Sequence, residues 1–282
     1  MKRGTREQTI KKLVKKFFFF GIVSSFLIST TVARKILRDR KKKLYACMRL
    51  TSFFSKLMKK NFGVTVRIDK SGSGYSKEKN YLVLSNHLSY LDVFLLFSEF
   101  PACFIASVDE VKETFLLGRA TELSGGFFVE RRNRTNLRSE IESIADILRM
   151  GLNVVLFPEG TTSNGEQVLP FKVPLLSVAQ KAGVEILPVC IRYTKINGEE
   201  VGRHNRDLVY YYGDMEFFTH ADTLLTVKSI DAELRILDPV DASSSNSRKD
   251  LAFELHDIIS SAYRGETPYG TGATREQSTG AA

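Results

Sequence analysis

The strongest constraint on the fold is an alternation of strand-like and helix-like segments that begins at Val64 and continues to the last helical segment. Short apolar or alternating runs, typical of strands, are followed by segments with helical spacing. This order favours an α/β fold in which helices pack on a sheet. The expected strands are 64–68, 81–85, 103–106, 127–130, 154–157, 185–193, 208–212 and 226–236. The expected helices are 91–100, 111–123, 137–148, 175–182 and one that starts after Ser247.

Charge and composition divide the chain into three parts. Residues 1–60 hold 18 Lys and Arg against two acidic residues, a net charge of +16. Residues 61–282 hold 23 basic and 30 acidic residues, so this part is acidic. Residues 265–282 are rich in Gly, Thr and Ser and have little to bury, which is typical of disorder. We expect an anchoring leader over 1–60, a single mixed-sheet α/β domain over 61–264 and a disordered tail over 265–282.

The distribution of charge argues against nucleic acid as a partner. A nucleic-acid-binding domain carries positive charge on its folded body, among aromatic side chains that stack on bases. Here the basic residues gather in the leader beside an apolar run, which is typical of a segment that binds an anionic membrane surface. The cysteines lack the spacing of a zinc site, so we expect no metal and three buried free thiols: Cys47, Cys103 and Cys190.

The apolar part of the leader is the uncharged run from Phe17 to Ala33. As a helix it would be about 25 Å long, short of a hydrocarbon core of about 30 Å. Seven basic residues lie in 1–16 and seven in 34–43, so the flanks favour neither orientation. We expect a re-entrant or interfacial anchor with both flanks on the cytoplasmic face, and a single span is the alternative. The segment 44–58 is expected to be an amphipathic interfacial helix or, alternatively, a helix that packs on the core.

His87 and Asp92 follow the expected strand 81–85. An imidazole titrates near neutral pH, and a carboxylate one helical turn away can fix its tautomer and stabilise its cation. Such a pair suits a general base that acts on an alcohol. No serine nucleophile lies in an obvious motif nearby, so the hydroxyl would belong to a substrate. The pair alone is equally consistent with a capping histidine beside a solvated aspartate.

Two further polar segments follow expected strands, and ligands of α/β folds gather beyond the carboxyl ends of strands. Arg131 and Arg132 follow 127–130, and an arginine binds phosphate through its planar fork, although a solvated basic loop is the plainer interpretation. Residues 158–163 place a carboxylate and three hydroxyls in a turn that can grip a hydroxylated or phosphorylated head group. The plainer interpretation is a simple turn, because Pro, Gly, Ser and Thr all favour turns.

Four sequence blocks together resemble the glycerolipid acyltransferases of the PlsC type. The blocks are Asn86-His87 with Asp92, 126–131, 157–161 and 186–189, in the order and spacing of that family. The resemblance covers about residues 60–260, and the leader is similar to the membrane-anchoring N-terminus of the family. It implies an acyltransferase domain of the 1-acylglycerol-3-phosphate acyltransferase kind.

The resemblance also implies a role for each matching residue. His87 would be the general base that deprotonates the acceptor hydroxyl, Asp92 would orient His87, and Arg131 would bind the acceptor phosphate. Pro188 belongs to the fourth block, which the family associates with the acyl-donor side. Three residues of the third block would shape the acceptor site: Glu159, Gly160 and Thr161.

The implied reaction is direct transfer of a fatty acyl group from acyl-CoA or acyl carrier protein to the free hydroxyl of a membrane lysophospholipid, without a cofactor or a metal. The expected acceptor is 1-acyl-sn-glycerol-3-phosphate, which gives phosphatidate in phospholipid biosynthesis. Many members carry a lysine near the position of Ser107, whereas this chain continues with Asp109 and Glu110. A zwitterionic or aminoacyl lysolipid is therefore the alternative acceptor. A lipid hydrolase that activates water and a non-catalytic lipid-binding membrane protein are alternatives of a different class.

Overall fold

The computed structural model describes residues 2–70, 74–107, 115–129, 134–245 and 247–266. The strands are β1 Val64–Asp69, β2 Leu82–Ser85, β3 Ala102–Ser107, β4 Phe127–Val129, β5 Asn153–Leu156, β6 Ile186–Ile196, β7 Glu199–Glu200 and β8 Ile230–Ile236. The helices are α1 Lys2–Ile36, α2 Arg40–Phe62, α3 Leu91–Glu99, α5 Phe115–Leu123, α6 Arg134–Arg149, α7 Ser177–Ala182, α8 Phe217–Leu224 and α9 Arg248–Arg264. Two short 3₁₀ turns are η1 Pro174–Leu176 and η2 Arg206–Leu208.

The described strands form one mixed sheet in the order β1-β8-β6-β2-β5-β3-β4, with β7 beside β6. β2 lies in the middle and pairs in parallel with β5 and β6, whereas β8 runs antiparallel to β6. All four residues of β2 are buried, as expected of a parallel strand that is covered on both faces. The sheet therefore confirms the predicted mixed α/β fold.

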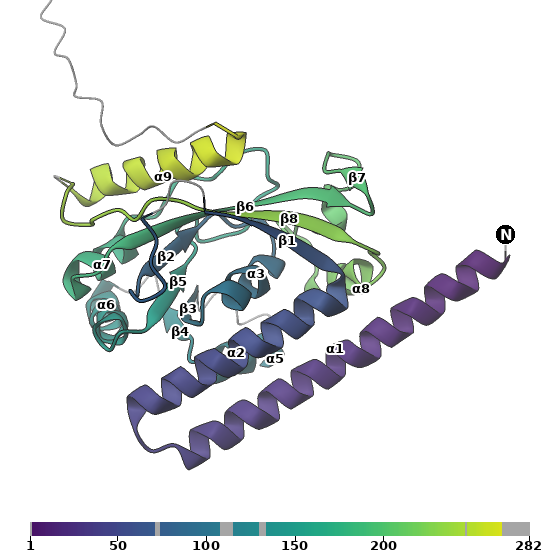
Figure 1. The fold of residues 1–282 in the computed structure, drawn as a ribbon, viewed down its shortest axis with the longest axis horizontal. Coiled ribbons are helices and arrows are strands. Elements are labelled where there is room, and N and C mark those ends of the chain that lie inside the picture. The colour runs from purple at the N-terminus through teal and green to yellow at the C-terminus, as the bar shows by residue number, and fades with distance from the viewer. Residues whose placement is uncertain (1, 71–73, 108–114, 130–133, 246, 267–282) are drawn as a thin grey trace, which may run out of the picture.

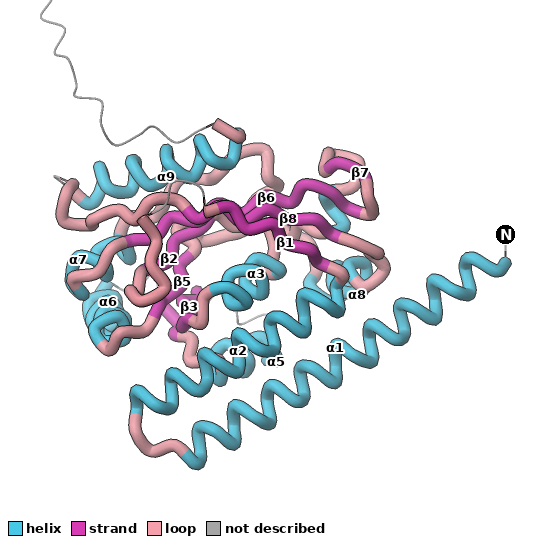
Figure 2. The backbone as a smooth tube through the Cα atoms, viewed as in Figure 1, coloured by secondary structure: helices cyan, strands magenta, loops and turns pink. Residues whose placement is uncertain are grey.

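Helices cover both faces of this sheet (Figure 1). α9 lies on one face, against β6, and α6 and α7 pack together at the same side. α2 and α3 cover the opposite face, and α1 lies along the outside of α2. Figure 2 shows the strands as a single layer between these two groups of helices. The carboxyl end of β2, where His87 follows, therefore lies within the sheet rather than at its edge.

α2 is a packing helix, the alternative that the sequence left open for the segment 44–58. Its buried face is directed at the domain and includes Cys47, Met48, Met58 and Phe62. The side chain of Asp39 caps its first turn by accepting a hydrogen bond from the Lys42 amide. Gly63 ends it in the left-handed region, at φ 73°, and a Cβ there would lie 2.6 Å from the Lys228 carbonyl oxygen.

α1 is long and apolar enough to cross a membrane, since Thr9–Ile36 has 28 residues with a mean hydropathy of 1.6. Only 11% of its apolar window is buried, and its outward face exposes aromatic and aliphatic side chains that include Phe17, Phe18, Phe20, Ile28 and Val32. Both ends of the apolar run contact the same domain. Lys12 and Lys16 form ion pairs with Asp222 of α8, and Arg34 donates to the Glu122 carbonyl oxygen at 2.7 Å.

The predicted strand 208–212 is wrong. Its first residue, Leu208, ends the turn η2, and residues 209–212 cross the loop that follows β2 without pairing in the sheet. A run of residues that favour strands misled the prediction, because the segment uses its backbone amide and carbonyl groups on that loop. The Val209 carbonyl oxygen accepts the Ser89 hydroxyl at 2.7 Å, and the Tyr211 amide donates to the Leu88 carbonyl oxygen at 3.0 Å.

Candidate active site

His87 and Asp92 are in direct contact, as the sequence predicted. His87 follows β2, and Asp92 lies in the first turn of α3, so the two side chains meet across a tight turn. His87 Nδ1 lies 2.8 Å from Asp92 Oδ2. The Asp92 side chain is fully buried, which excludes the alternative of a solvated aspartate. About an eighth of the His87 side chain is exposed, so its ring borders solvent while its partner does not.

Asp92 is an acceptor on every side. Its Oδ2 also accepts the backbone amides of Leu88 at 2.6 Å and Ser89 at 2.9 Å, and its Oδ1 accepts the Tyr193 hydroxyl at 2.6 Å. Each of these three groups donates to Asp92, so its oxygens act as acceptors throughout the site. The proton between Asp92 and His87 therefore belongs to Nδ1, which leaves the lone pair of the neutral imidazole on Nε2.

Tyr193 is a site residue that the sequence did not reveal. It lies on β6, 101 positions beyond Asp92, and is 4% exposed. Burial raises the pKa of Tyr193 well above its usual value, and the neighbouring Asp92 carboxylate acts in the same direction. The phenol therefore stays protonated and serves as a fixed donor to Asp92.

The residues between β2 and α3, 86–90, form a turn that we call the catalytic turn after its candidate base, His87. Asn86 fixes the start of this turn to the sheet. Its side-chain amide donates to the Ile191 carbonyl oxygen at 2.9 Å, and its Oδ1 accepts the Ile191 amide at 2.8 Å. This pair of bonds continues the β2–β6 pairing by one residue through a side chain, at a buried position. The backbone of His87 is consequently held in register with β6.

Glu159 supports the other side of His87. It follows β5, is 2% exposed, and accepts the His87 amide on Oε1 at 2.7 Å and the Leu169 amide on Oε2 at 2.8 Å. Burial raises the pKa of Glu159 to about 7, although the two backbone hydrogen bonds act in the opposite direction. Its carboxyl group thus binds the protein backbone, and direct contact of Glu159 with an acceptor remains a prediction.

The remaining predicted residues differ in their placement. Gly160 adopts φ 69°, in the left-handed region that glycine favours, and turns the chain after Pro158. Thr161 is exposed next to this turn, and Pro188 is buried in β6, opposite Leu84 of β2. Arg131 lies outside the described residues. The structure therefore places Gly160 just after β5 and Pro188 within β6, on the two strands that flank β2.

The His87 ring is also held by an aromatic contact. It stacks on Phe157 with ring centroids 3.8 Å apart and an angle of 6° between the planes. Among the described residues, Nε2 of His87 has no hydrogen-bond partner. The ring is thus fixed in position by Asp92 and Phe157 while its basic nitrogen stays available. Such an arrangement can accept a proton from a hydroxyl and return it to a leaving group.

Tyr90, the residue just before α3, connects the site to α8. The Tyr90 hydroxyl lies 3.0 Å from His220 Nδ1, and its ring contacts those of Tyr211 and Phe217. Burial lowers the pKa of His220, so this imidazole is neutral at physiological pH. The cluster packs α8 and the 209–212 segment against the catalytic turn.

In the described parts of the chain, no group of three or more His, Cys, Asp or Glu side chains is arranged to hold a metal ion. The three cysteines are buried free thiols, as expected.

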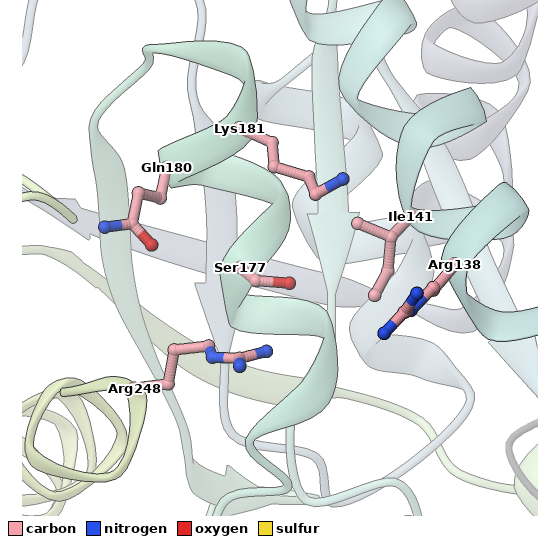
Figure 3. A pocket seen from close by; sticks show the side chains of 6 residues that line it. All are labelled: Arg138, Ile141, Ser177, Gln180, Lys181 and Arg248. Atoms are coloured by element: carbon pink, nitrogen blue, oxygen red, sulfur yellow. The ribbon is translucent and has the colours of Figure 1, made fainter. Parts of the chain in front are cut away.

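A cavity of about 480 Å³ lies between α6, α7 and α9, and three basic side chains line it (Figure 3). This cavity is separate from the His87 turn.

Comparisons with known proteins identify the family. A model of the family described as Acyltransferase matches residues 67–192. A lyso-ornithine lipid O-acyltransferase of Brucella abortus is 36% identical over 219 residues, which cover 75% of this chain and 80% of that protein. The chain belongs to the PlsC-type glycerolipid acyltransferases.

Other relatives of this acyltransferase agree in reaction but differ in the lipid that they are named for. A 1-acyl-sn-glycerol-3-phosphate acyltransferase of Neisseria gonorrhoeae is 30% identical over 178 residues, which cover 63% of this chain and 67% of that protein. The crystal structure of the 1-acyl-sn-glycerophosphate acyltransferase PlsC of Thermotoga maritima has the same fold, with a TM-score of 0.65 at 22% identity. The match covers 92% of this chain and 97% of that chain. These matches confirm the predicted O-acyltransferase and its lysolipid class of substrate.

Proposed function

We propose that His87 is the general base of a direct acyl transfer from a thioester to the hydroxyl of a membrane lysolipid. The observation that carries this proposal is the contact between His87 Nδ1 and the buried Asp92 carboxylate, which leaves Nε2 as the basic atom. The bonds of Asp92 to two backbone amides and to Tyr193 hold this carboxylate in place before substrate binds. Such preorganisation reduces the rearrangement that the reaction requires.

In the proposed reaction, Nε2 of His87 removes the proton of the acceptor hydroxyl as its oxygen attacks the thioester carbonyl carbon. The carbonyl π electrons move to oxygen and give a tetrahedral oxyanion, and the imidazolium is stabilised by Asp92. When the oxyanion collapses, the carbon–sulfur bond breaks and the imidazolium returns its proton to the departing thiolate. The products are an ester and a free thiol, and His87 ends the cycle neutral.

The acceptor that we propose is an aminoacyl lysolipid of the lyso-ornithine kind. The relative from Brucella abortus that is named for this lipid covers more of both chains, at higher identity, than the relative from Neisseria gonorrhoeae. Asp109 and Glu110 follow β3 in the sequence, and carboxylates there favour an ammonium group over a phosphate monoester. The second candidate is 1-acyl-sn-glycerol-3-phosphate, which Arg131 of the second block and the Neisseria relative favour.

We also propose that α1 lies along the cytoplasmic surface of the membrane. Lys12 and Lys16 contact α8 at one end of the apolar run, and Arg34 contacts the end of α5 at the other. Because both ends are bound to the same domain, a perpendicular span would require these contacts to break. The exposed phenylalanines of α1 then enter the lipid, and the basic residues beside them meet anionic head groups.

The decisive experiment offers the purified protein a panel of lysolipids with acyl-CoA and with acyl carrier protein, and identifies the products by mass. We expect acylated lyso-ornithine lipid, and formation of phosphatidate alone would establish the second candidate.

The role of His87 is tested by substitution. His87→Ala should lower the rate of acyl transfer by about 10²- to 10⁴-fold, the usual contribution of a general base. His204→Ala is the matched control, because His204 is exposed on a loop. Near-normal turnover of His87→Ala would refute the proposal, as would release of free fatty acid without consumption of lysolipid.

A further inference from the structure

We propose that the cavity between α6, α7 and α9 binds the phosphate of the acyl donor, on the phosphopantetheine arm that acyl-CoA and acyl carrier protein share. This inference rests on the proposed acyl transfer and adds a binding site for its second substrate. It is carried by the charge and the position of the cavity, which are considered in turn.

The cavity presents converging cations without a carboxylate. Its volume is about 480 Å³, and in Figure 3 the guanidinium groups of Arg138 and Arg248 point toward one another across it. The complete lining consists of Arg138, Ile141, Ser177, Gln180, Lys181 and Arg248. Arginine forks match the oxygens of a phosphate, and lysine adds a point charge.

The charges of the two arginines are not neutralised by neighbouring side chains. Within the described part of the chain, neither Arg138 nor Arg248 forms an ion pair. On α6, Glu142 lies outside the lining and is bound by both Arg149 and Lys181, at 2.8 Å and 2.9 Å. These two partners lower the pKa of Glu142, so its charge is fully developed and already compensated.

A second cavity shows a site whose arginine charges are neutralised by a carboxylate of the protein itself. It has a volume of about 340 Å³, lies beside Tyr193, and is also lined by several arginines. There, however, Glu166 is part of the lining and forms ion pairs with both Arg203 and Arg206. The cavity between α6, α7 and α9 is therefore the stronger candidate for an external anion.

The position of the cavity suits a substrate that reacts at His87 but binds by a distant group. α6 begins at Arg134, just after the second sequence block, and α7 follows the segment in which the Leu169 amide donates to Glu159, so α7 is close in the chain to a support of His87. α9 lies on the opposite side of the sheet from α1 (Figure 1). A water-soluble donor can therefore approach this side while the membrane occupies the other.

The chemistry of the donor explains why its phosphate would bind away from His87. A long pantetheine chain separates the phosphate from the sulfur that carries the acyl group. A site that contacts both ends must therefore have an anion pocket at some distance from the base. Ile141 offers an apolar wall at the same cavity for the uncharged part of the arm.

The test measures donor KM for full-length protein in detergent micelles with Arg138→Gln, Arg248→Gln and the double variant. The matched control is Lys249→Gln, which removes one charge from the next residue of α9 but lies outside the lining. Three donors are compared at a fixed lysolipid concentration: acyl-CoA, acyl carrier protein, and an acyl-pantetheine that lacks the phosphate. Each arginine variant should raise the KM of the phosphorylated donors about tenfold, the usual effect of one charge-assisted bond, with kcat and the lysolipid KM unchanged.

The acyl-pantetheine separates the phosphate from the rest of the donor, because its KM should be the same in the wild type and in every variant. An effect on acyl carrier protein alone would assign the cavity to the carrier protein's surface and overturn the phosphate assignment. Equal donor KM values in the wild type and the double variant would also overturn it. Absence of acyl transfer by the wild type with every donor would instead refute the proposed function. In that case calorimetry with CoA still tests the cavity, since the double variant should bind CoA at least tenfold more weakly.

Discussion

Glu159 provides the sharpest prediction, because burial and hydrogen bonding act on its carboxyl group in opposite directions. The group is 2% exposed and accepts the backbone amides of His87 and Leu169. Burial nevertheless prevails and raises its pKa from 4.5 to about 7. The protein therefore holds a proton on Glu159 at pH values where the unfolded chain has already lost it.

This difference makes stability depend on pH in a direction unusual for a carboxyl group. Between pH 4.5 and 7 the folded protein binds more protons at Glu159 than the unfolded chain, so its stability falls as the pH rises. The contribution is fully present below pH 4.5 and is lost once the pH has passed the folded pKa of about 7. Since one pKa unit corresponds to about 1.4 kcal/mol, the total loss is about 3 kcal/mol.

Glu159→Gln removes the titration but keeps the shape of the side chain. The glutamine oxygen can accept only one of the two backbone amides, that of His87 or that of Leu169. The glutamine NH₂ group faces the second amide, so a buried donor is left unpaired, which costs about 1–3 kcal/mol. At pH 5 the variant should therefore be less stable than the wild type by roughly 1–2 kcal/mol. By pH 8 the wild type has lost about 2–3 kcal/mol more through Glu159, so the difference should vanish or reverse.

The measurement is denaturant unfolding in detergent micelles, followed by circular dichroism at several pH values from 5 to 8. Other groups titrate in both proteins, so the difference between the two free energies of unfolding isolates Glu159. The reasoning would be refuted by a difference that stays constant over this range.

Two further predictions follow from the site and from α1. Tyr193→Phe removes one charge-assisted hydrogen bond to Asp92 and should lower kcat about tenfold, with both KM values unchanged and a shifted acid limb of the pH–rate profile; a rise in KM at constant kcat would contradict a positioning role. A tag at the N-terminus should be cleaved by protease added to the cytoplasmic face of membrane vesicles and protected from the other face, and the opposite pattern would contradict an α1 that lies on the cytoplasmic surface.

Much of the fold could be predicted because local chemistry determines it. The strands next to β2 are covered on both faces and therefore appear as apolar runs in the sequence. α9 begins after Ser247, whose hydroxyl caps the helix by accepting the Asp250 amide. No such signal marks the start of α8, because Glu216 caps it instead of one of the usual capping residues. The run 208–212 is rich in residues that favour strands, but its backbone forms hydrogen bonds with the catalytic turn, a tertiary contact that a local pattern cannot reveal.

The site was predictable to the extent that it is local. His87 and Asp92 are five residues apart and meet across one turn, so their spacing alone suggested a contact. Tyr193 reaches Asp92 from β6, and in the sequence it is an ordinary aromatic residue of an alternating strand. The direction of the Glu159 side chain depends on the loop that brings Leu169 close, and no motif specifies that loop.

The contacts of the catalytic turn explain why its residues come from distant parts of the chain. Asn86 bonds to β6, Ser89 to the 209–212 segment, and His87 to Glu159 after β5, so three separate segments hold one turn. A base on a mobile loop would lose much of its catalytic advantage, because orientation accounts for a large part of the barrier that an enzyme removes. α1 lies on one side of the sheet and α9, which borders the cationic cavity, on the other, so in our proposal the lipid acceptor and the soluble donor approach from different sides. In the proposed mechanism, rigid support for His87 is thus the structural requirement that lets two such different substrates react at one imidazole.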